Sequence, residues 1–442
     1  MPERRTLLLL IISAVPFSLA GISPMAVYLA VLANCTVIAL YALDVHSLPA
    51  KADLSLQREL PAILSLDEAT DVILRIRNEA GRTLRAHLQD NPPPSCQPSP
   101  VRIKLSVAPD SVSEQVYEMR PLKRGRFHFA PSVLRVRGPL GMAYRDYEFG
   151  PEDDSSAERQ WNFTVYPRIG GTTPQRMAAL ARRLESGYHR LEREVEGTIP
   201  SQLSKWTAGD NYRDINWPAT ARYDYPMVTQ FDTDRNQSIY IFVDCGRLMS
   251  MPVGRLCKLD YAVNACADLA RVAVERGDRV GICGFSRDIK MWVDGRNKRQ
   301  HLLGILRRLA ELEADTFATN FSAPFNMFLS RSRRRSLCLF LTTFSEGTGV
   351  EQLTARLAGL RPRHVPAVVS LTDPEMEVDA HQSPETFDDA CRKLAAADLR
   401  EEIEVCAARL QQRQGYFLQA PADTLSPSAV QAYLDVKARG AL

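Results

Sequence analysis

Two uncharged apolar runs near the start constrain this chain more than any other feature. Residues 6–22 read TLLLLIISAVPFSLAGI and residues 25–43 read MAVYLAVLANCTVIALYAL. Each run is near the roughly 17–25 residues that a helix needs to cross the hydrocarbon core of a bilayer. The Ser-Pro pair at 23–24 between them is a turn signal. The sequence therefore predicts a transmembrane helical hairpin within residues 1–45, with the lipid bilayer as its partner.

The basic residues that flank the hairpin predict its orientation. Arg4 and Arg5 precede it, and Lys51 and Arg58 follow it. Because positive charge is retained on the cytoplasmic side, both ends are expected there. The expectation is a multi-pass protein of the cytoplasmic (inner) membrane whose soluble domains face the cytoplasm. The alternative is that the first run is a signal peptide, since two arginines precede it.

The cysteines and the overall charge narrow the class of protein. Most of the 9 cysteines stand in apolar runs and none forms a CxxC pair, which is typical of buried, reduced thiols in a reducing compartment. The 7 histidines form no HxxxH or HxH pair, so no histidine metal site is expected. The net charge of +3 over 442 residues is small, so no nucleic-acid partner is predicted.

The soluble part changes its periodicity twice. Residues 53–168 alternate apolar and polar positions between Pro/Gly turns, which predicts an antiparallel β-sandwich. Residues 169–235 are expected to be a connector. From residue 236 to 442, apolar strands alternate with amphipathic helices, which predicts an α/β doubly wound domain with a mostly parallel sheet. Ligands bind such sheets at the carboxyl ends of strands, where Asp244 stands.

The connector contains the polar and aromatic stretch WTAGDNYRDINWPATAR at 206–222. An enzymatic interpretation would make Asp210 and Asp214 an acid/base pair, but the stretch has no cysteine or histidine and no nucleophile beside a base. A structural interpretation pairs the arginines with carboxylates and stacks them on tryptophans, as an interdomain clamp. A third interpretation is an exposed docking epitope. The residues concerned are Trp206, Gly209, Asp210, Arg213, Asp214, Trp217 and Arg222.

With these residues in view, the chain resembles the bacterial domain-of-unknown-function family number 58. Gly209, Asp210, Arg213, Trp217 and Arg222 match the family signature at its spacing, together with an Ile and an Ala. The run LKRGRFHFAPSVLRVRGPLGMAYR at 122–145 resembles a second family motif, with Gly138 in place of an aspartate. The resemblance implies a membrane hairpin, a β-rich segment and a domain similar to von Willebrand factor A.

Domains of the von Willebrand factor A type hold magnesium with Asp-x-Ser-x-Ser, a loop threonine and a further aspartate. Magnesium requires near-octahedral oxygen ligands, and hydroxyls and carboxylates supply some of them. This chain departs from that pattern: Gly246 and Leu248 replace the serines, and Thr343 stands where the later aspartate would be. Only Asp244 and Thr319 match. The site is therefore expected to be degenerate, with no metal or other cofactor bound in the usual way.

The leading hypothesis is a non-enzymatic, membrane-anchored adaptor or assembly protein of unknown pathway. The resemblance implies a partner as well, an AAA+ ATPase of the MoxR type, because such proteins are often encoded beside one. One alternative is a metal-dependent ligand-binding von Willebrand factor A domain, with an outward-facing soluble part. A second alternative is a hydrolase centred on Asp210.

Overall fold

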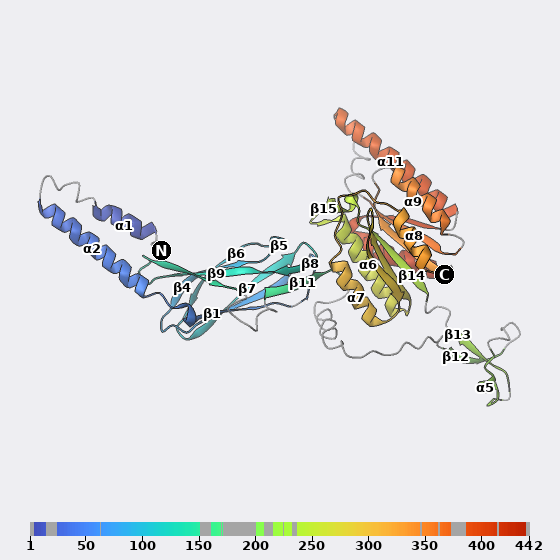
Figure 1. Cartoon of the computed structure of the whole chain (residues 1–442), viewed down its shortest axis with the longest axis horizontal. Helices are drawn as coiled ribbons and strands as arrows, with labels where there is room; N and C mark the ends of the chain where they lie inside the picture. Colours follow the sequence, from blue (N-terminus) through green and yellow to red (C-terminus); the bar gives the residue numbers. More distant parts are fainter. Residues whose placement is uncertain are drawn as a thin grey trace. The chain divides into compact units, whose positions relative to one another are not determined.

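The computed structural model of the chain divides into two units, Met1–Tyr166 and Pro167–Leu442, each with its own core (Figure 1). The residues that the structure describes are 4–14, 24–61, 63–150, 161–168, 170, 200–206, 215–223, 225–231, 237–344, 347–360, 363–372, 386–412 and 415–438.

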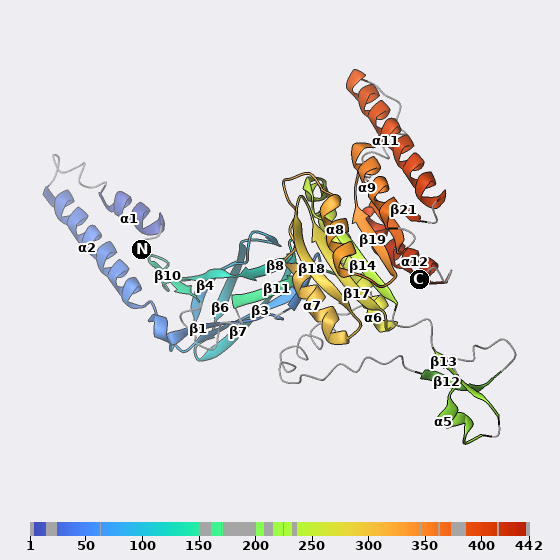
Figure 2. The same cartoon turned by 45° about the vertical axis from the view of Figure 1, so that its right-hand side comes forward.

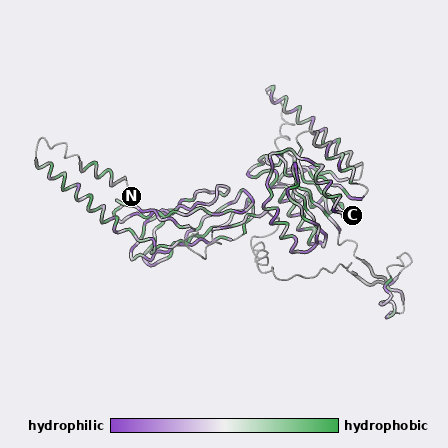
Figure 3. The backbone as a smooth tube through the Cα atoms, viewed as in Figure 1, coloured by the Kyte–Doolittle hydropathy of each residue, from purple (hydrophilic) through white to green (hydrophobic). Residues whose placement is uncertain are grey.

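Helix α2 (Pro24–His46, 23 residues) is the membrane-spanning candidate of the first unit. Its segment Val27–His46 is long and apolar enough to cross a membrane, with a mean hydropathy of 1.8, and most of it is coloured hydrophobic in Figure 3. Helix α1 (Arg4–Ala14) has 11 residues, about 16 Å, which is too short to cross. A first spanning helix over 6–22 is therefore not confirmed, and residues 15–22 of that prediction lie outside the described residues.

Two antiparallel sheets form most of the rest of the first unit. One has the order β1-β3-β7-β5 and the other β10-β9-β4-β6. The inward positions alternate along each strand, as in Leu84, Ala86 and Leu88 of β4, which are all buried. The strands are β1 (Leu54–Glu59), β3 (Thr70–Asn78), β4 (Leu84–Asn91), β5 (Cys96–Gln97), β6 (Val101–Val107), β7 (Ser111–Pro121), β9 (Ala130–Arg137) and β10 (Tyr144–Phe149).

A smaller sheet and a helical turn complete this unit. The sheet has the order β2-β11-β8, from β2 (Ile63–Ser65), β8 (Gly125–His128) and β11 (Asn162–Tyr166). Strand β11 runs parallel to β2 and antiparallel to β8. The 3-10 turn η2 (Lys51–Asp53) leads from the end of α2 into β1.

A buried carboxylate joins α2 to the sandwich. Asp44, 1% exposed, accepts hydrogen bonds at 2.8 Å from the backbone N–H groups of Leu140, Met142 and Ala143. A Cβ added at Gly138 would lie 2.4 Å from the Asp44 carboxylate. Gly138, where the resemblance implies an aspartate, therefore leaves room for a carboxylate that comes from the helix.

Charged residues also stand inside the sandwich. Arg58 is 3% exposed and forms an ion pair with Asp90, which is fully buried. The hydroxyls of Ser132 and Tyr117 each donate a hydrogen bond of 2.6 Å to a different carboxylate oxygen of Asp90. These residues come from β1, β4, β7 and β9, so the group links the two large sheets. Arg58 was expected to be a cation flanking the hairpin, but it is a core residue.

Two aromatic rings enclose the Arg58 guanidinium, whose Cζ lies 3.9 Å from the ring centroid of Phe129 and 4.4 Å from that of Trp161. Planar guanidinium groups stack well on such faces. A clamp of arginine, carboxylate and tryptophan therefore exists in this protein, inside the β-sandwich.

A six-stranded sheet with the order β18-β17-β14-β19-β20-β21 forms the centre of the second unit. All neighbours in it are parallel except the edge strand β18. Strands β14, β19 and β20 are buried at every position, as expected for strands covered on both faces. The strands are β14 (Ser238–Asp244), β17 (Arg279–Phe285), β18 (Ile289–Arg296), β19 (Ser336–Thr342), β20 (Val365–Leu371) and β21 (Tyr416–Ala420).

Helices lie on both faces of this sheet (Figures 1 and 2). One face is covered by α6 (Lys258–Glu275) and α12 (Leu425–Ala438), which pack on each other, and α7 (Arg299–Ala310) packs on α6 and β18. The other face carries α8 (Ser322–Arg331) and α9 (Gly347–Gly359), and α11 (Phe387–Gln412) packs on α9 and β21. Short elements at its edges are η5 (Arg247–Ser250), β15 (Pro252–Val253), β16 (Leu256–Cys257) and η6 (Ala422–Thr424).

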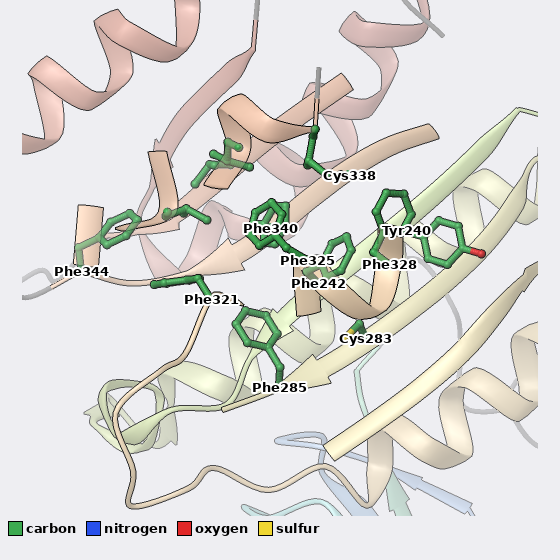
Figure 4. Packing of buried hydrophobic residues seen from close by; sticks show 14 of the residues in the cluster. Tyr240, Phe242, Cys283, Phe285, Phe321, Phe325, Phe328, Cys338, Phe340 and Phe344 are labelled. Carbon is green, nitrogen blue, oxygen red and sulfur yellow. The ribbon is translucent and has the colours of Figure 1, made fainter. Parts of the chain in front are cut away.

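Aromatic side chains fill the face beneath α8 and α9 (Figure 4). The rings of Phe242 and Phe340 stack with centroids 4.3 Å apart, and Phe325 stacks on Phe340 at 4.9 Å. Cys283 and Cys338 are fully buried in the same cluster, and burial raises the pKa of Cys283 to about 12. These thiols act as small apolar core residues.

Candidate functional site

The strand order of the six-stranded sheet identifies where a site should lie. In chain order, β14 is its first strand, with β17 and β18 on one side and β19, β20 and β21 on the other. The order reverses direction between β14 and β19. In open parallel sheets, ligands bind beyond the carboxyl ends of the strands at this switch point. Asp244 ends β14 and Thr342 ends β19, so both stand at that point.

Asp244 is buried, 2% exposed, and its carboxylate is held from three directions. Oδ1 accepts the Thr319 hydroxyl at 2.7 Å and the Gly246 N–H at 2.8 Å. Oδ2 accepts the Thr342 hydroxyl at 2.6 Å. Burial raises the Asp244 pKa, and these three donors act in the opposite direction. Thr319, one of the residues of the predicted degenerate site, contacts Asp244, and the second hydroxyl comes from Thr342, which is not among those residues.

The remaining positions of the degenerate metal site do not contribute oxygen atoms to this group. Thr343 donates its hydroxyl to the carbonyl of Leu371 at 3.0 Å, away from Asp244. A Cβ at Gly246 would lie 2.1 Å from the Thr319 hydroxyl, so a serine does not fit without rearrangement. Leu248 is half-buried in η5 and supplies only carbon atoms.

These donors do not fit a magnesium ion. One carboxylate and two hydroxyls converge, and both hydroxyls donate hydrogen bonds to that carboxylate. Magnesium prefers near-ideal octahedral oxygen coordination. Among the described residues, no group of three or more His, Cys, Asp or Glu side chains could hold a metal ion.

A second polar group stands beside the first at the same edge of the sheet. Ser286 follows β17, and its hydroxyl donates a hydrogen bond of 2.8 Å to the Asp315 carboxylate. Lys290 forms an ion pair with the same carboxylate at 3.2 Å. The Ser286 hydrogen bond is the main cause that lowers the Asp315 pKa. The Asp315 N–H donates to the carbonyl of Cys245 at 2.6 Å. The loop at 311–321 is thereby tied to the ends of both β14 and β17.

Basic and aromatic side chains are exposed next to this group. Phe317 is 48% exposed, and the Arg287 guanidinium lies over its ring at 4.5 Å. The Arg247 N–H donates to the Phe317 carbonyl at 2.8 Å, and the Arg247 side chain is exposed. Arg247, Arg287 and Phe317 are together called the edge patch. Exposed arginine and aromatic side chains are typical anchors of protein interfaces.

The signature stretch is described only in part. Gly209, Asp210, Arg213 and Asp214 lie outside the described residues. Trp206 is half-buried, and its N–H donates to the Pro226 carbonyl at 2.9 Å, beside the antiparallel pair β12 (Pro200–Lys205) and β13 (Met227–Phe231). The proposed clamp stays a prediction, because its central residues lie outside the described part of the chain.

The end of the signature forms a short helix, α5 (Trp217–Thr220). Asn216 caps it by accepting the Ala219 N–H at 3.0 Å, and the Asn216 N–H donates to the Met227 carbonyl at 2.8 Å. Trp217 is 69% exposed and Arg222 is exposed as well. The interdomain clamp and the docking epitope both stay predictions for this stretch.

Some solved structures resemble parts of this chain weakly. An aerotolerance-related membrane protein from Bacteroides fragilis aligns over 46% of this chain and 100% of its own, at 11% identity and a TM-score of 0.30. The CARDB domain of the PF1109 protein from Pyrococcus furiosus aligns over 26% of this chain and 87% of its own, at 11% identity and a TM-score of 0.18.

Similar sequences occur in mycobacteria and carry no assigned function. An uncharacterised protein of Mycobacterium bovis is 26% identical over 238 residues, which cover 48% of this chain and 74% of the relative. An uncharacterised protein of Mycobacterium tuberculosis matches to the same extent. The family model described as "Protein of unknown function DUF58" matches residues 202–390. That range contains the described part of the signature, the Asp244 group and the edge patch. Over this range, the chain is similar to the DUF58 family.

Proposed function

We propose that this protein is a non-enzymatic adaptor, anchored in the membrane by its N-terminal helix, that docks a protein partner at the carboxyl edge of the six-stranded sheet. The observation that carries the proposal is the Asp244 group. It occupies the switch point where such sheets bind ligands, yet its carboxylate is buried and engaged by internal donors. The Asp244 carboxylate therefore has a structural role: its hydrogen bonds hold the loops at the carboxyl ends of the strands in place.

The partner is proposed to be an AAA+ ATPase of the MoxR type, as the family resemblance implies. We assign residues 236–442 to the von Willebrand factor A-like domains, with the mixed six-stranded order and the helices on both faces as support. The edge patch adds two cations and an exposed ring, which suit a partner surface with acidic and apolar groups. The soluble domains are proposed to face the cytoplasm, where such an ATPase and its ATP are found.

Capture of the ATPase from solubilised membranes, with and without ATP, tests the proposal. The Arg287→Glu variant inverts a charge in the edge patch, and we expect it to reduce capture by about tenfold, which corresponds to one lost charge contact. Arg276→Glu is the matched control. Arg276 is exposed at the end of α6, just before β17 begins, and so lies at the amino ends of the parallel strands. Equal capture by both variants would contradict docking at the edge patch.

Calorimetric titration with magnesium tests the part of this proposal that assigns no metal ion to the Asp244 group. The donors around Asp244 predict no saturable binding in the micromolar range, and Asp244→Asn should leave the titration unchanged. Tight binding that disappears in Asp244→Asn would instead favour a metal-dependent ligand-binding domain.

A further inference from the structure

An open groove lies where α2 meets the β-sandwich of the first unit, with a volume of about 620 Å³. Its walls are Ile38, Tyr41, Ala42, Val45 and His46 of α2, the segment 48–50, and Arg145 of β10. Among the described residues that line it, none is acidic. We propose that this groove, called the interface groove, binds an anionic phospholipid of the surrounding leaflet.

The depth of the groove in a bilayer follows from the helix that forms it. The spanning segment is Val27–His46, and the groove covers its last part, from Ile38 onward. That part rises about 12 Å along the helix axis. The wall near Ile38, called the lower wall, therefore lies at the depth of acyl chains. The wall near His46, called the upper wall, lies at the depth of headgroups. Ile38 is 57% exposed, so the lower wall is open to lipid.

Arg145 gives the upper end its charge preference. Its side chain is exposed and lines the groove from β10, an edge strand. The Tyr147 hydroxyl, which interacts with Arg145, donates to the Pro49 carbonyl at 2.5 Å, so β10 is tied to the segment that follows α2. A guanidinium held at headgroup level suits a phosphate oxygen. Tyr41, half-buried in the wall, is the residue type that gathers at this level of a membrane.

The position of the groove favours a lipid over a soluble anion. A free phosphate would use the Arg145 end and leave the apolar α2 wall uncovered, whereas a phospholipid covers both. The Asp44 contacts with the 138–143 loop hold α2 and the sheet together, so both walls stay in place. The proposal rests on α2 crossing the membrane, as the proposed function does.

Native mass spectrometry of the full chain released from nanodiscs tests it, with phosphatidylglycerol and phosphatidylcholine as separate probes. We expect the wild type to retain phosphatidylglycerol and Arg145→Gln to retain about tenfold less, as for one lost charge-assisted contact. Arg102→Gln is the matched control, because Arg102 is an exposed arginine on β6, the opposite edge strand of the same sheet. Ala42→Phe fills the groove and should also reduce retention, whereas Leu43→Phe, outside the groove and 64% exposed, should not.

Each contrary outcome has a distinct meaning. Equal retention by Arg145→Gln and Arg102→Gln would overturn the site, and so would equal retention of the two lipids. Displacement of phosphatidylglycerol by millimolar inorganic phosphate would show that the anion alone binds, and would overturn the lipid. Failure of the wild type to enter nanodiscs would refute membrane anchoring itself, whereas entry without selective retention would refute only the groove.

Discussion

At the scale of single residues, two glycines leave room for polar side chains that pack against them. Gly138 leaves room for Asp44 and Gly246 for Thr319. The resemblances drawn from the sequence imply an acid at the first position and a hydroxyl at the second. In the structure, each is occupied by a polar group from another part of the chain. Close packing leaves no space for the missing side chain to return.

Restoring the serine at Gly246 is therefore expected to destabilise the protein. The new Cβ would lie 2.1 Å from the Thr319 hydroxyl, and overpacking of this kind costs about 1–3 kcal/mol. Gly304→Ser in α7 is the control, since nothing lies within 4 Å of a Cβ there and serine is a better helix former. Chemical denaturation of both variants measures the difference. A Gly246→Ser protein as stable as wild type would contradict the packing.

His364 predicts a pH dependence of stability. It is 1% exposed at the start of β20, its ring lies against Phe328 at 4.7 Å, and burial lowers its pKa to about 4. The unfolded chain binds a proton below the ordinary pKa of about 6.5, and the folded chain does so only near 4. The stability contributed by this histidine is therefore present above pH 6.5 and is lost as pH falls toward 4.

The measurement is the free energy of unfolding of wild type and His364→Leu between pH 4 and 7.5. We expect the difference between the two proteins to shift by up to about 3 kcal/mol against wild type as the pH falls. A difference that does not change with pH would contradict a buried neutral imidazole.

At the scale of elements, single charged residues on inward-facing strand positions join the two sheets of the sandwich. Arg58 follows Leu54 and Leu56 on one face of β1, and Asp90 follows Leu88 on the inward face of β4. The alternating pattern contained this information, because each charge falls on the apolar side of its strand. The pairing of the two charges is not visible in the sequence, because it depends on how one sheet packs on the other.

Removing one member of this pair is expected to cost about 3–5 kcal/mol, because the other charge is then stranded in the core. Thermal unfolding of Arg58→Ala tests the expectation. Arg75→Ala is the matched control: Arg75 pairs with Glu59 and Glu114 on the exposed surface of the same sheet, and ion pairs exposed to water contribute little to stability. Equal midpoints for both variants would show that the buried pair adds nothing.

At the scale of the whole molecule, the chain contains two units with separate cores. Each has its own internal polar link. In the first it is the Arg58 group; in the second, Asp278 is fully buried and accepts Tyr433 at 2.6 Å and Lys437 at 2.8 Å, which fastens α12 beneath the sheet. Separate cores are expected to unfold as separate cooperative units.

Calorimetry of the full chain in detergent should therefore show two transitions. Arg58→Ala should lower only one midpoint and Asp278→Ala only the other, since each variant strands a charge in a different core. A single transition that both variants shift together would show that the two units unfold as one.

Much of the architecture follows from the sequence alone, for physical reasons. An apolar run of spanning length, as in α2, can satisfy its backbone in lipid only as a helix, and fully apolar strands such as β14 and β19 must be covered on both faces. Only the tertiary structure decided that Thr342 and not Thr343 meets Asp244, that Arg58 is a core residue, and that Asp44 reaches the 138–143 loop. These contacts join residues far apart in the chain, and their geometry depends on how whole elements pack.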